Sequence, residues 1–284
     1  MGTLVRRIVL ALMLACVSLL TLAGELEEAV YGSGANRFAL ATGSPGELGL
    51  LKVLAEKFAS THDAQMVWIK AGTGQSLNLL RDKKVDMVMV HAPAQVDKAV
   101  QEGWASNKTL IGSNEFYIVG PKADSAKIAS ASSAVDAYRR IAEAQSAFVS
   151  RGDNSGTHQK EMQIWKQSGM TPVGVWYIVT KDFMTASLKR ANQEGAYFMT
   201  DSSTWIMEKH VAPELMILFS GDRFLVNTYH AIVAPKGATQ GRDTAEKFVA
   251  FVASSVGQQI IAQYGMAMFG EGLYNDAIYA KRFD

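Results

Sequence analysis

The chain contains the stretch Arg151-Gly152-Asp153-Asn154-Ser155-Gly156-Thr157-His158. It follows a predicted strand, which contains the apolar run 147–149, and it precedes a predicted helix over 159–167. A helix that begins at such a turn presents unpaired backbone N–H groups and the positive end of its dipole. Gly156 lets a ligand approach the backbone closely, and the hydroxyls of Ser155 and Thr157 add donors. Arg151 adds a planar fork of donors that stays charged. The stretch therefore predicts a binding site for an oxyanion.

The first 24 residues have the pattern of a secretory signal peptide. Arg6 and Arg7 precede an apolar run over 8–22, and small residues follow at Ala23-Gly24. The run is shorter than the roughly 20 residues of a membrane-spanning helix. Cys16 is the only cysteine, and the residues after it stay apolar where a lipoprotein turns polar. We therefore expect cleavage rather than lipidation, and a secreted protein without disulfides or thiolate metal sites.

The charge of the mature chain excludes several classes of protein. Loss of the two arginines of the signal peptide leaves 26 of the 28 basic residues against 27 acidic ones, a net charge of −1. Proteins that bind nucleic acid or acidic membranes through basic surfaces do not have this balance. The histidines show no metal-ligand spacing, so we expect neither a metal nor a cofactor. Hydrophobic residues make up 48% of the chain, which is typical of a globular protein with a substantial core.

The order of predicted elements indicates two α/β lobes. In the first unit we expect strands at 37–41, 65–70, 85–90 and 109–119, and helices at 46–60, 75–81 and 93–103. In the second we expect strands at 147–150, 175–179, 196–200 and 216–219, and helices at 135–144, 159–167 and 184–193. An apolar segment at 224–234 and helices at 244–256 and 258–264 complete the chain. Such alternation predicts that each lobe is a mostly parallel sheet flanked by helices.

The lobes are expected to divide the chain unevenly. Residues 25–120 plus 225–284 would form lobe 1, and residues 121–224 would form lobe 2. The chain would cross between them near Gly120-Pro121 and again within 224–234.

Loops rich in Gly, Ser and Thr follow the strands of both predicted units. In open α/β sheets ligands bind beyond the carboxyl ends of the strands, so four loops should converge on one cleft between the lobes: 41–44, 72–74, 151–157 and 200–203. The predicted ligand-binding residues are Thr42, Ser44, Thr73, Gly74, Arg151, Ser155, Gly156 and Thr157.

A set of motifs in fixed order resembles a known family. These are Thr42-Gly43-Ser44, Gly72-Thr73-Gly74-Gln75, Val90-His91-Ala92-Pro93, Ile118-Val119-Gly120-Pro121, the 150–158 segment and Gly195-Ala196-Tyr197. From Phe38 to Lys236 the chain resembles the tungstate-binding proteins of ABC uptake transporters. The resemblance implies a two-lobed, type II-like periplasmic binding protein, a monomer and not an enzyme. It would close about a hinge on tungstate, molybdate or a related tetrahedral anion and deliver it to a membrane permease. The Arg-x-x-x-Ser-Gly-Thr core also occurs in phosphate-binding proteins, so it indicates an oxyanion more firmly than tungstate.

Three positions depart from that family pattern. The first loop has Ala41-Thr42-Gly43-Ser44 where the family has Thr-Thr-Thr-Ser, which removes two hydroxyls. A Gly-rich turn is replaced by Lys181-Asp182-Phe183-Met184, and Asp201 is followed by Ser202 rather than Arg. Lys181 and Phe183 would suit a carboxylate with an organic body, so a small organic acid remains an alternative ligand.

Other classes of function have weaker signals. A secreted hydrolase or transferase would use an anion pocket around Ser44 and Arg151, but Thr42-Gly43-Ser44-Pro45-Gly46 lacks the first glycine of a nucleophile elbow. No base is placed beside Ser44. We expect Ser44 instead to cap a helix in which Pro45 is the first residue. His91 ends a buried strand and is expected to pack or support the site. A sensor that presents its ligand to a membrane receptor is a further alternative.

Overall fold

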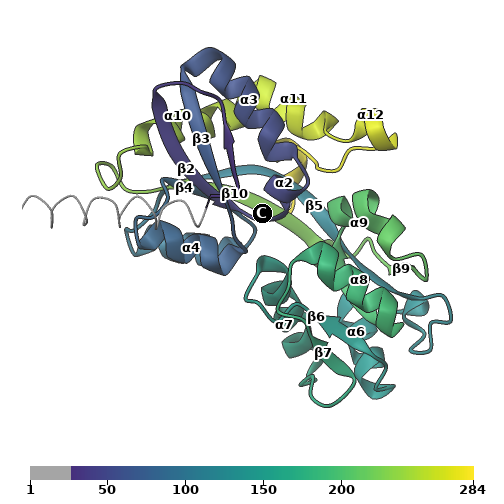
Figure 1. Ribbon diagram of the computed structural model, residues 1–284. Helices are drawn as coiled ribbons and strands as arrows, with labels where there is room; N and C mark the ends of the chain where they lie inside the picture. The colour runs from purple at the N-terminus through teal and green to yellow at the C-terminus, as the bar shows by residue number, and fades with distance from the viewer. Residues whose placement is uncertain (1–26) are drawn as a thin grey trace, which may run out of the picture.

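The computed structural model describes residues 27–284 (Figure 1). The predicted signal peptide and Cys16 lie outside the described residues. Within the described part of the chain, no helix is long and apolar enough to cross a membrane.

The sheet of lobe 1 is covered by helices on both faces. Its strand order is β1 (Ala29–Tyr31), β3 (Ala64–Lys70), β2 (Asn36–Thr42), β4 (Met87–Val90), β10 (Val226–Val233) and β5 (Ser106–Pro121). Side chains alternate across a strand, and in β2 Phe38 and Leu40 enter one core cluster whereas Ala41 enters another. The first cluster packs under α3 (Leu50–His62), α10 (Arg242–Ala253) and α11 (Ser255–Gln263); the second packs over α4 (Thr73–Arg81) and α5 (Pro93–Gln101). Figure 1 shows α3 and α10 on the face opposite α4.

Lobe 2 repeats this plan with a smaller sheet. Its strands run in the order β5, β8 (Tyr197–Asp201), β6 (Phe148–Ser150) and β7 (Tyr177–Val179), with β9 (Leu215–Phe219) also paired to β5. Its helices are α6 (Ala134–Glu143), α7 (Gly156–Ser168), α8 (Met184–Glu194) and α9 (Ser202–Glu208). Phe148 packs towards α6 and α7, and the next residue, Val149, packs towards α8. The two-lobed α/β fold predicted from the sequence is confirmed.

The two lobes share the long strand β5. Residues up to Glu115 pair with β10, and Phe116 to Val119 pair with β8. The strand thus changes partners ahead of Gly120-Pro121, where the sequence placed the crossing. The parallel pairs lie within each lobe, whereas β5 and β10 run antiparallel to their neighbours. The lobe boundaries at 120/121 and 224/225 stay a prediction.

Three elements differ from the prediction. The expected helix over 46–60 is split into α2 (Ser44–Glu47) and α3, because Gly49 lies in the left-handed region with φ of 87°. The loop expected at 200–203 is instead the start of α9, where the Asp201 side chain caps the helix by accepting from the Thr204 N–H. Strand β1 was not predicted. The remaining short helices are α12 (Met266–Phe269) and α13 (Ala277–Ala280).

Candidate functional site

A narrow pocket between the lobes contains most of the predicted side chains. Lobe 1 contributes Thr42, Gly43, Ser44, Pro45, Gly72, Thr73, Met89 and His91, and lobe 2 contributes Arg151, Ser155 and Phe183. Three of the predicted residues do not line this pocket: Gly74, Gly156 and Thr157. They lie in the first turns of α4 and α7. Five of the eight predicted residues are thus brought to one pocket by loops from both lobes.

Two helix N-termini face each other across the pocket. Helix α4 begins at Thr73 after Gly72, and helix α7 begins at Gly156 after its cap Ser155. A Cβ built on Gly72 would lie only 3.4 Å from the Ser155 Cβ. The first N–H groups of both helices are therefore close together, and both dipoles present their positive ends to the same space. An anion there would receive donors from both lobes.

The hydroxyls of the site differ in their freedom to donate. Thr42 Oγ1 donates to the Met89 carbonyl at 2.7 Å, so its proton is already used. Ser155 Oγ accepts from the His158 N–H at 3.3 Å, which leaves its own proton for a ligand. Ser44 and Thr73 have no side-chain hydrogen bond with any residue in 27–284. The structure therefore offers the hydroxyls of Ser44, Thr73 and Ser155 to an anion, whereas that of Thr42 stabilises the loop.

Arg151 is buried, with 4% of its surface exposed, and is held by two partners. Its Nη2 lies 2.6 Å from Asp153 Oδ2, and its Nε donates to the Asp182 carbonyl at 3.1 Å. Burial opposes ionisation of Asp153, but the Arg151 charge and hydrogen bonds from Ser155 outweigh it and lower the pKa of that carboxyl. The guanidinium is thus oriented, and its charge is balanced locally.

The sequence reasoning missed Asp153 and Asp182 as partners of Arg151. Asp153 could have been found, because an acidic residue two positions after an arginine in a tight turn is a signal for such a pair. The second contact uses a backbone carbonyl, which the residue type does not reveal.

His91 links the pocket to the strands that join the lobes. Its Nδ1 lies 2.8 Å from Asn227 Oδ1, and its ring stacks on Tyr229 with centroids 5.0 Å apart. Burial lowers the pKa of His91 to about 4, so the ring is neutral at neutral pH and Nδ1 donates to Asn227. Asn227 in turn donates to Asn114 Oδ1 at 2.7 Å. With Nε2 left as an acceptor, His91 cannot donate to an anion, in agreement with its predicted supporting role.

Three contacts between the lobes lie beside the pocket. A Cβ added to Gly156 would lie 2.4 Å from the His91 ring, and one added to Gly74 would lie 2.4 Å from the Asn154 amide. Gln95 Nε2 donates to Gln159 Oε1 at 2.7 Å. At Gly156 and Gly74 the two lobes therefore approach each other so closely that a Cβ atom would clash.

Three expectations drawn from the sequence are corrected by this geometry. The 200–203 segment does not line the pocket, because Asp201 caps α9 and Ser202 Oγ accepts from the Glu115 N–H on β5. Lys181 is exposed and does not line the pocket either, whereas Phe183 does. Ser44 follows the helix cap Gly43 rather than acting as the cap. His91, the nearest candidate base, uses Nδ1 on Asn227 and makes no hydrogen bond with Ser44 among the described residues.

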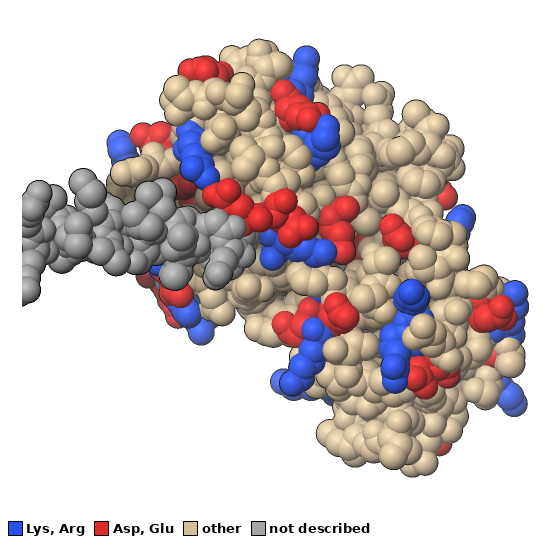
Figure 2. All heavy atoms as spheres, viewed as in Figure 1, with Lys and Arg blue, Asp and Glu red and all other residues tan. Residues whose placement is uncertain are grey.

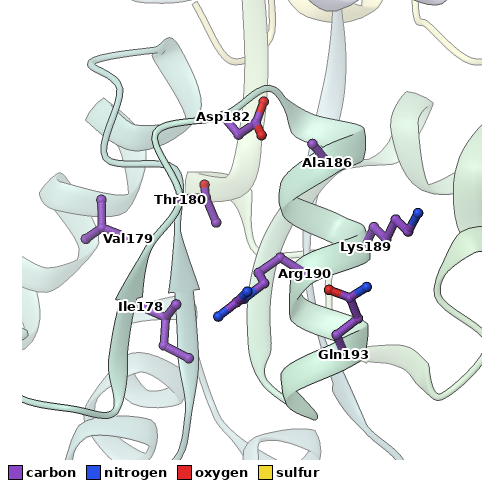
Figure 3. Close-up of a pocket in the computed structure, with 8 residues that line it drawn as sticks. All are labelled: Ile178, Val179, Thr180, Asp182, Ala186, Lys189, Arg190 and Gln193. Atoms are coloured by element: carbon purple, nitrogen blue, oxygen red, sulfur yellow. The ribbon is translucent and has the colours of Figure 1, made fainter.

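A second, wider groove lies in lobe 2 between β7 and α8 (Figure 3). Its volume is about 500 Å³, and Arg190 points into it. Arg190 is paired with Glu194 at 2.7 Å, and none of the predicted binding residues lines the groove. Within residues 27–284 no group of three or more His, Cys, Asp or Glu side chains is placed to hold a metal. The interlobe pocket therefore remains the candidate site.

Comparison with known proteins agrees with this fold. Residues 29–256 match the PBP superfamily domain. The chain is 32% identical over 237 residues to a tungstate-binding protein of Peptoclostridium acidaminophilum, covering 82% of each chain. It is 35% identical over 229 residues to a putative ABC transporter anion-binding protein of Haloferax volcanii, covering 78% of this chain and 67% of that one. The crystal structure of the tungstate ABC transporter from Geobacter sulfurreducens is similar, with a TM-score of 0.73, 36% identity, and coverage of 82% and 100%.

Proposed function

Since the chain belongs to the PBP superfamily and, within it, to the family of ABC-transporter tungstate-binding proteins, we propose that it is the periplasmic solute-binding component of an ABC uptake transporter. It captures a small tetrahedral oxyanion, tungstate first among them, by closing its lobes, and then delivers the anion to the permease. It acts as a monomer, exported by its N-terminal segment, and performs no chemistry on the ligand.

The observation that carries this proposal is the meeting of two helix N-termini with one guanidinium. Helices α4 and α7 come from different lobes, and Arg151 lies beside them. Each N-terminus attracts an anion through unpaired N–H groups and its dipole. An anion bound between them gains contacts from both lobes only when these are closed, so the same interactions would bind the ligand and close the protein.

A thermal-shift screen of the purified protein tests this function. The ligands are tungstate, molybdate, sulfate, phosphate and a set of small carboxylates. A true ligand at 100 times its dissociation constant should stabilise the fold by about 2.7 kcal/mol. We expect tungstate or molybdate to give the largest shift at a given concentration. No shift with any inorganic oxyanion would contradict the proposal.

A small organic acid is the second candidate ligand. Pro45, Met89 and Phe183 form an apolar part of the pocket wall, which the compact inorganic anion does not need. The same screen separates the two, because a carboxylate that stabilised the protein more than every oxyanion would favour the organic ligand.

A further inference from the structure

Phe183 makes contact with both lobes at the wall of the anion pocket. It directly precedes α8 in lobe 2, and its ring lies 5.5 Å from the Arg151 guanidinium carbon. From lobe 1, Lys70 Nζ lies 4.4 Å from the ring centroid, at the end of β3. Lys70 is itself held by Glu47 Oε1 at 3.1 Å. The ring thus sits between two cations that belong to different lobes.

The pocket is too small for a tetrahedral oxyanion while every side chain keeps this position. The free volume between its walls is about 10 Å³, roughly the space of one water molecule. An anion of five heavy atoms needs more, so part of the wall must move to admit it.

Phe183 is held more weakly than the wall residues whose side chains are fixed by hydrogen bonds. Thr42 is fixed by the Met89 carbonyl, Ser155 by its cap on α7, and Arg151 by Asp153 and Asp182. The phenyl ring has no hydrogen bond to break, and it lies against the Lys70 ammonium and the Arg151 guanidinium. Phe183 is half-buried, and the two residues before it, Lys181 and Asp182, are exposed.

We propose that Phe183 is the gate of the anion pocket and limits the ligand to compact anions. The ring moves off Arg151 to admit the anion and returns against Lys70 to close over it. Residue 183 then sets the rates of binding and release, and a ligand with an organic body meets the ring. This inference rests on the proposed function, because it concerns the same pocket.

Stopped-flow tryptophan fluorescence with tungstate tests the gate. Trp68 Nε1 donates to the Thr42 carbonyl at 3.1 Å, so an indole contacts the binding loop directly. In Phe183→Ala we expect the association and dissociation rate constants each to rise at least tenfold, with the dissociation constant changed less than tenfold. Phe183→Tyr keeps a ring between the cations and should keep wild-type rates. Lys70→Met weakens the closed position, and we expect a smaller rise in both rates.

Controls separate a gate from a merely structural residue. Phe269→Ala removes a half-exposed ring from the short helix α12, and its rates should equal those of the wild type. A structural role for Phe183 would lower the melting temperature and leave the exchange rates unchanged, which would overturn the gate. Phenylphosphonate, whose phenyl group can replace the missing ring, should bind Phe183→Ala more tightly than the wild type. Equal binding, or none by either protein, would overturn the size limit.

The two proposals fail in distinguishable ways. Wild-type protein that binds no inorganic tetrahedral oxyanion would overturn the proposed function and the gate with it. Tungstate binding with unchanged exchange in Phe183→Ala would overturn the gate alone.

Discussion

At the scale of single residues, Arg151 shows what a motif can and cannot reveal. The turn that contains it, together with Thr42, Ser44, Thr73 and Ser155, could be predicted as a site because glycines, hydroxyls and one arginine follow strand ends. The contact between the guanidinium and Asp182 could not be predicted, because it uses the backbone carbonyl. The hydrogen bond from the Thr42 hydroxyl to the Met89 carbonyl could not be predicted either, because it depends on a neighbouring strand.

Arg151→Ala should remove ligand binding while the protein stays folded. A charge-assisted hydrogen bond contributes about 1.5–3 kcal/mol, and Asp153, left without its partner, would also repel the anion. Arg151→Lys should restore binding only in part, because a lysine lacks the planar fork of donors. Calorimetric titration with the best oxyanion measures the loss, and wild-type affinity in Arg151→Ala would remove this residue from the site.

Glu161 should make stability depend on pH. Burial raises the pKa of this carboxyl from 4.5 to about 7, despite hydrogen bonds from Tyr177, Ser150 and Trp165. A raised pKa means that the folded state binds the proton more tightly, so the contribution of Glu161 to stability is fully present below pH 4.5 and is lost as the pH rises through about 7. The fall attributable to Glu161 is up to about 3 kcal/mol.

Urea denaturation between pH 4.5 and 8 checks this. Glu161→Gln cannot ionise, so the difference in unfolding free energy between wild type and variant should shrink or reverse as the pH rises. Glu143→Gln, at the exposed end of α6, is the matched control. A difference that stays constant with pH would show that Glu161 does not titrate in this range. The periodicity of α7 does place Glu161 on the buried face with Ile164 and Trp165, but it says nothing of the three donors.

At the scale of elements, local sequence signals predicted where a helix begins better than where a helix is interrupted. Ser155 before a glycine and a threonine identifies the beginning of α7, and its side chain does cap the helix. The break between α2 and α3 was missed because Gly49 lies inside an otherwise regular apolar pattern, and a glycine there is compatible with a helix. The exchange of partners within β5 was not predicted, because the strand runs unbroken from Ser106 to Pro121 and neither glycine nor proline stands at Glu115-Phe116, where its partner changes.

The glycines at the helix starts should limit how closely the lobes can approach. Gly156→Ala and Gly74→Ala would place a Cβ 2.4 Å from His91 and Asn154, respectively, in the opposite lobe. We expect each variant to bind its oxyanion at least tenfold more weakly by calorimetry, with an unchanged melting temperature in the absence of ligand. Gly72→Ala meets Ser155 only at 3.4 Å, an ordinary contact, and serves as the control. Equal loss in all three variants would indicate damage to the helices rather than hindered closure.

At the scale of the whole molecule, the contacts between lobes predict hinge closure. Within residues 27–284, β5 runs through both lobes: it forms an antiparallel ribbon with β10 in lobe 1 and pairs with β8 in lobe 2. Ligand should therefore rotate the lobes about the region of Glu115 and Val226. Small-angle scattering with and without tungstate measures the change, and the radius of gyration should fall on binding. An unchanged radius at saturation, from protein that starts open, would contradict hinge closure.

Binding should depend only weakly on salt. Asp153 balances Arg151, and basic and acidic side chains are interspersed over the face shown in Figure 2. Salt screens mainly exposed charges that are more than about 8–10 Å apart, whereas the proposed site is buried between the lobes. Calorimetry from about 0.05 to 0.5 M sodium chloride, roughly a threefold change in Debye length, should show only a modest change in affinity. A steep loss not explained by chloride competition would place the ligand on an open basic surface.

The paired ribbon of β5 and β10 also bears on how such proteins diversify. Glu115 lies opposite Val226, and Asn114 lies opposite Asn227. The segment 116–225 therefore leaves and rejoins the rest of the chain at adjacent positions, which is the geometry that tolerates domain insertion. Recombination at these two neighbouring points would exchange the wall that carries Arg151 and Phe183 and keep the wall that carries Thr42 and Thr73. A new anion preference could then be inherited as a cassette, in one genetic event rather than through a succession of point mutations.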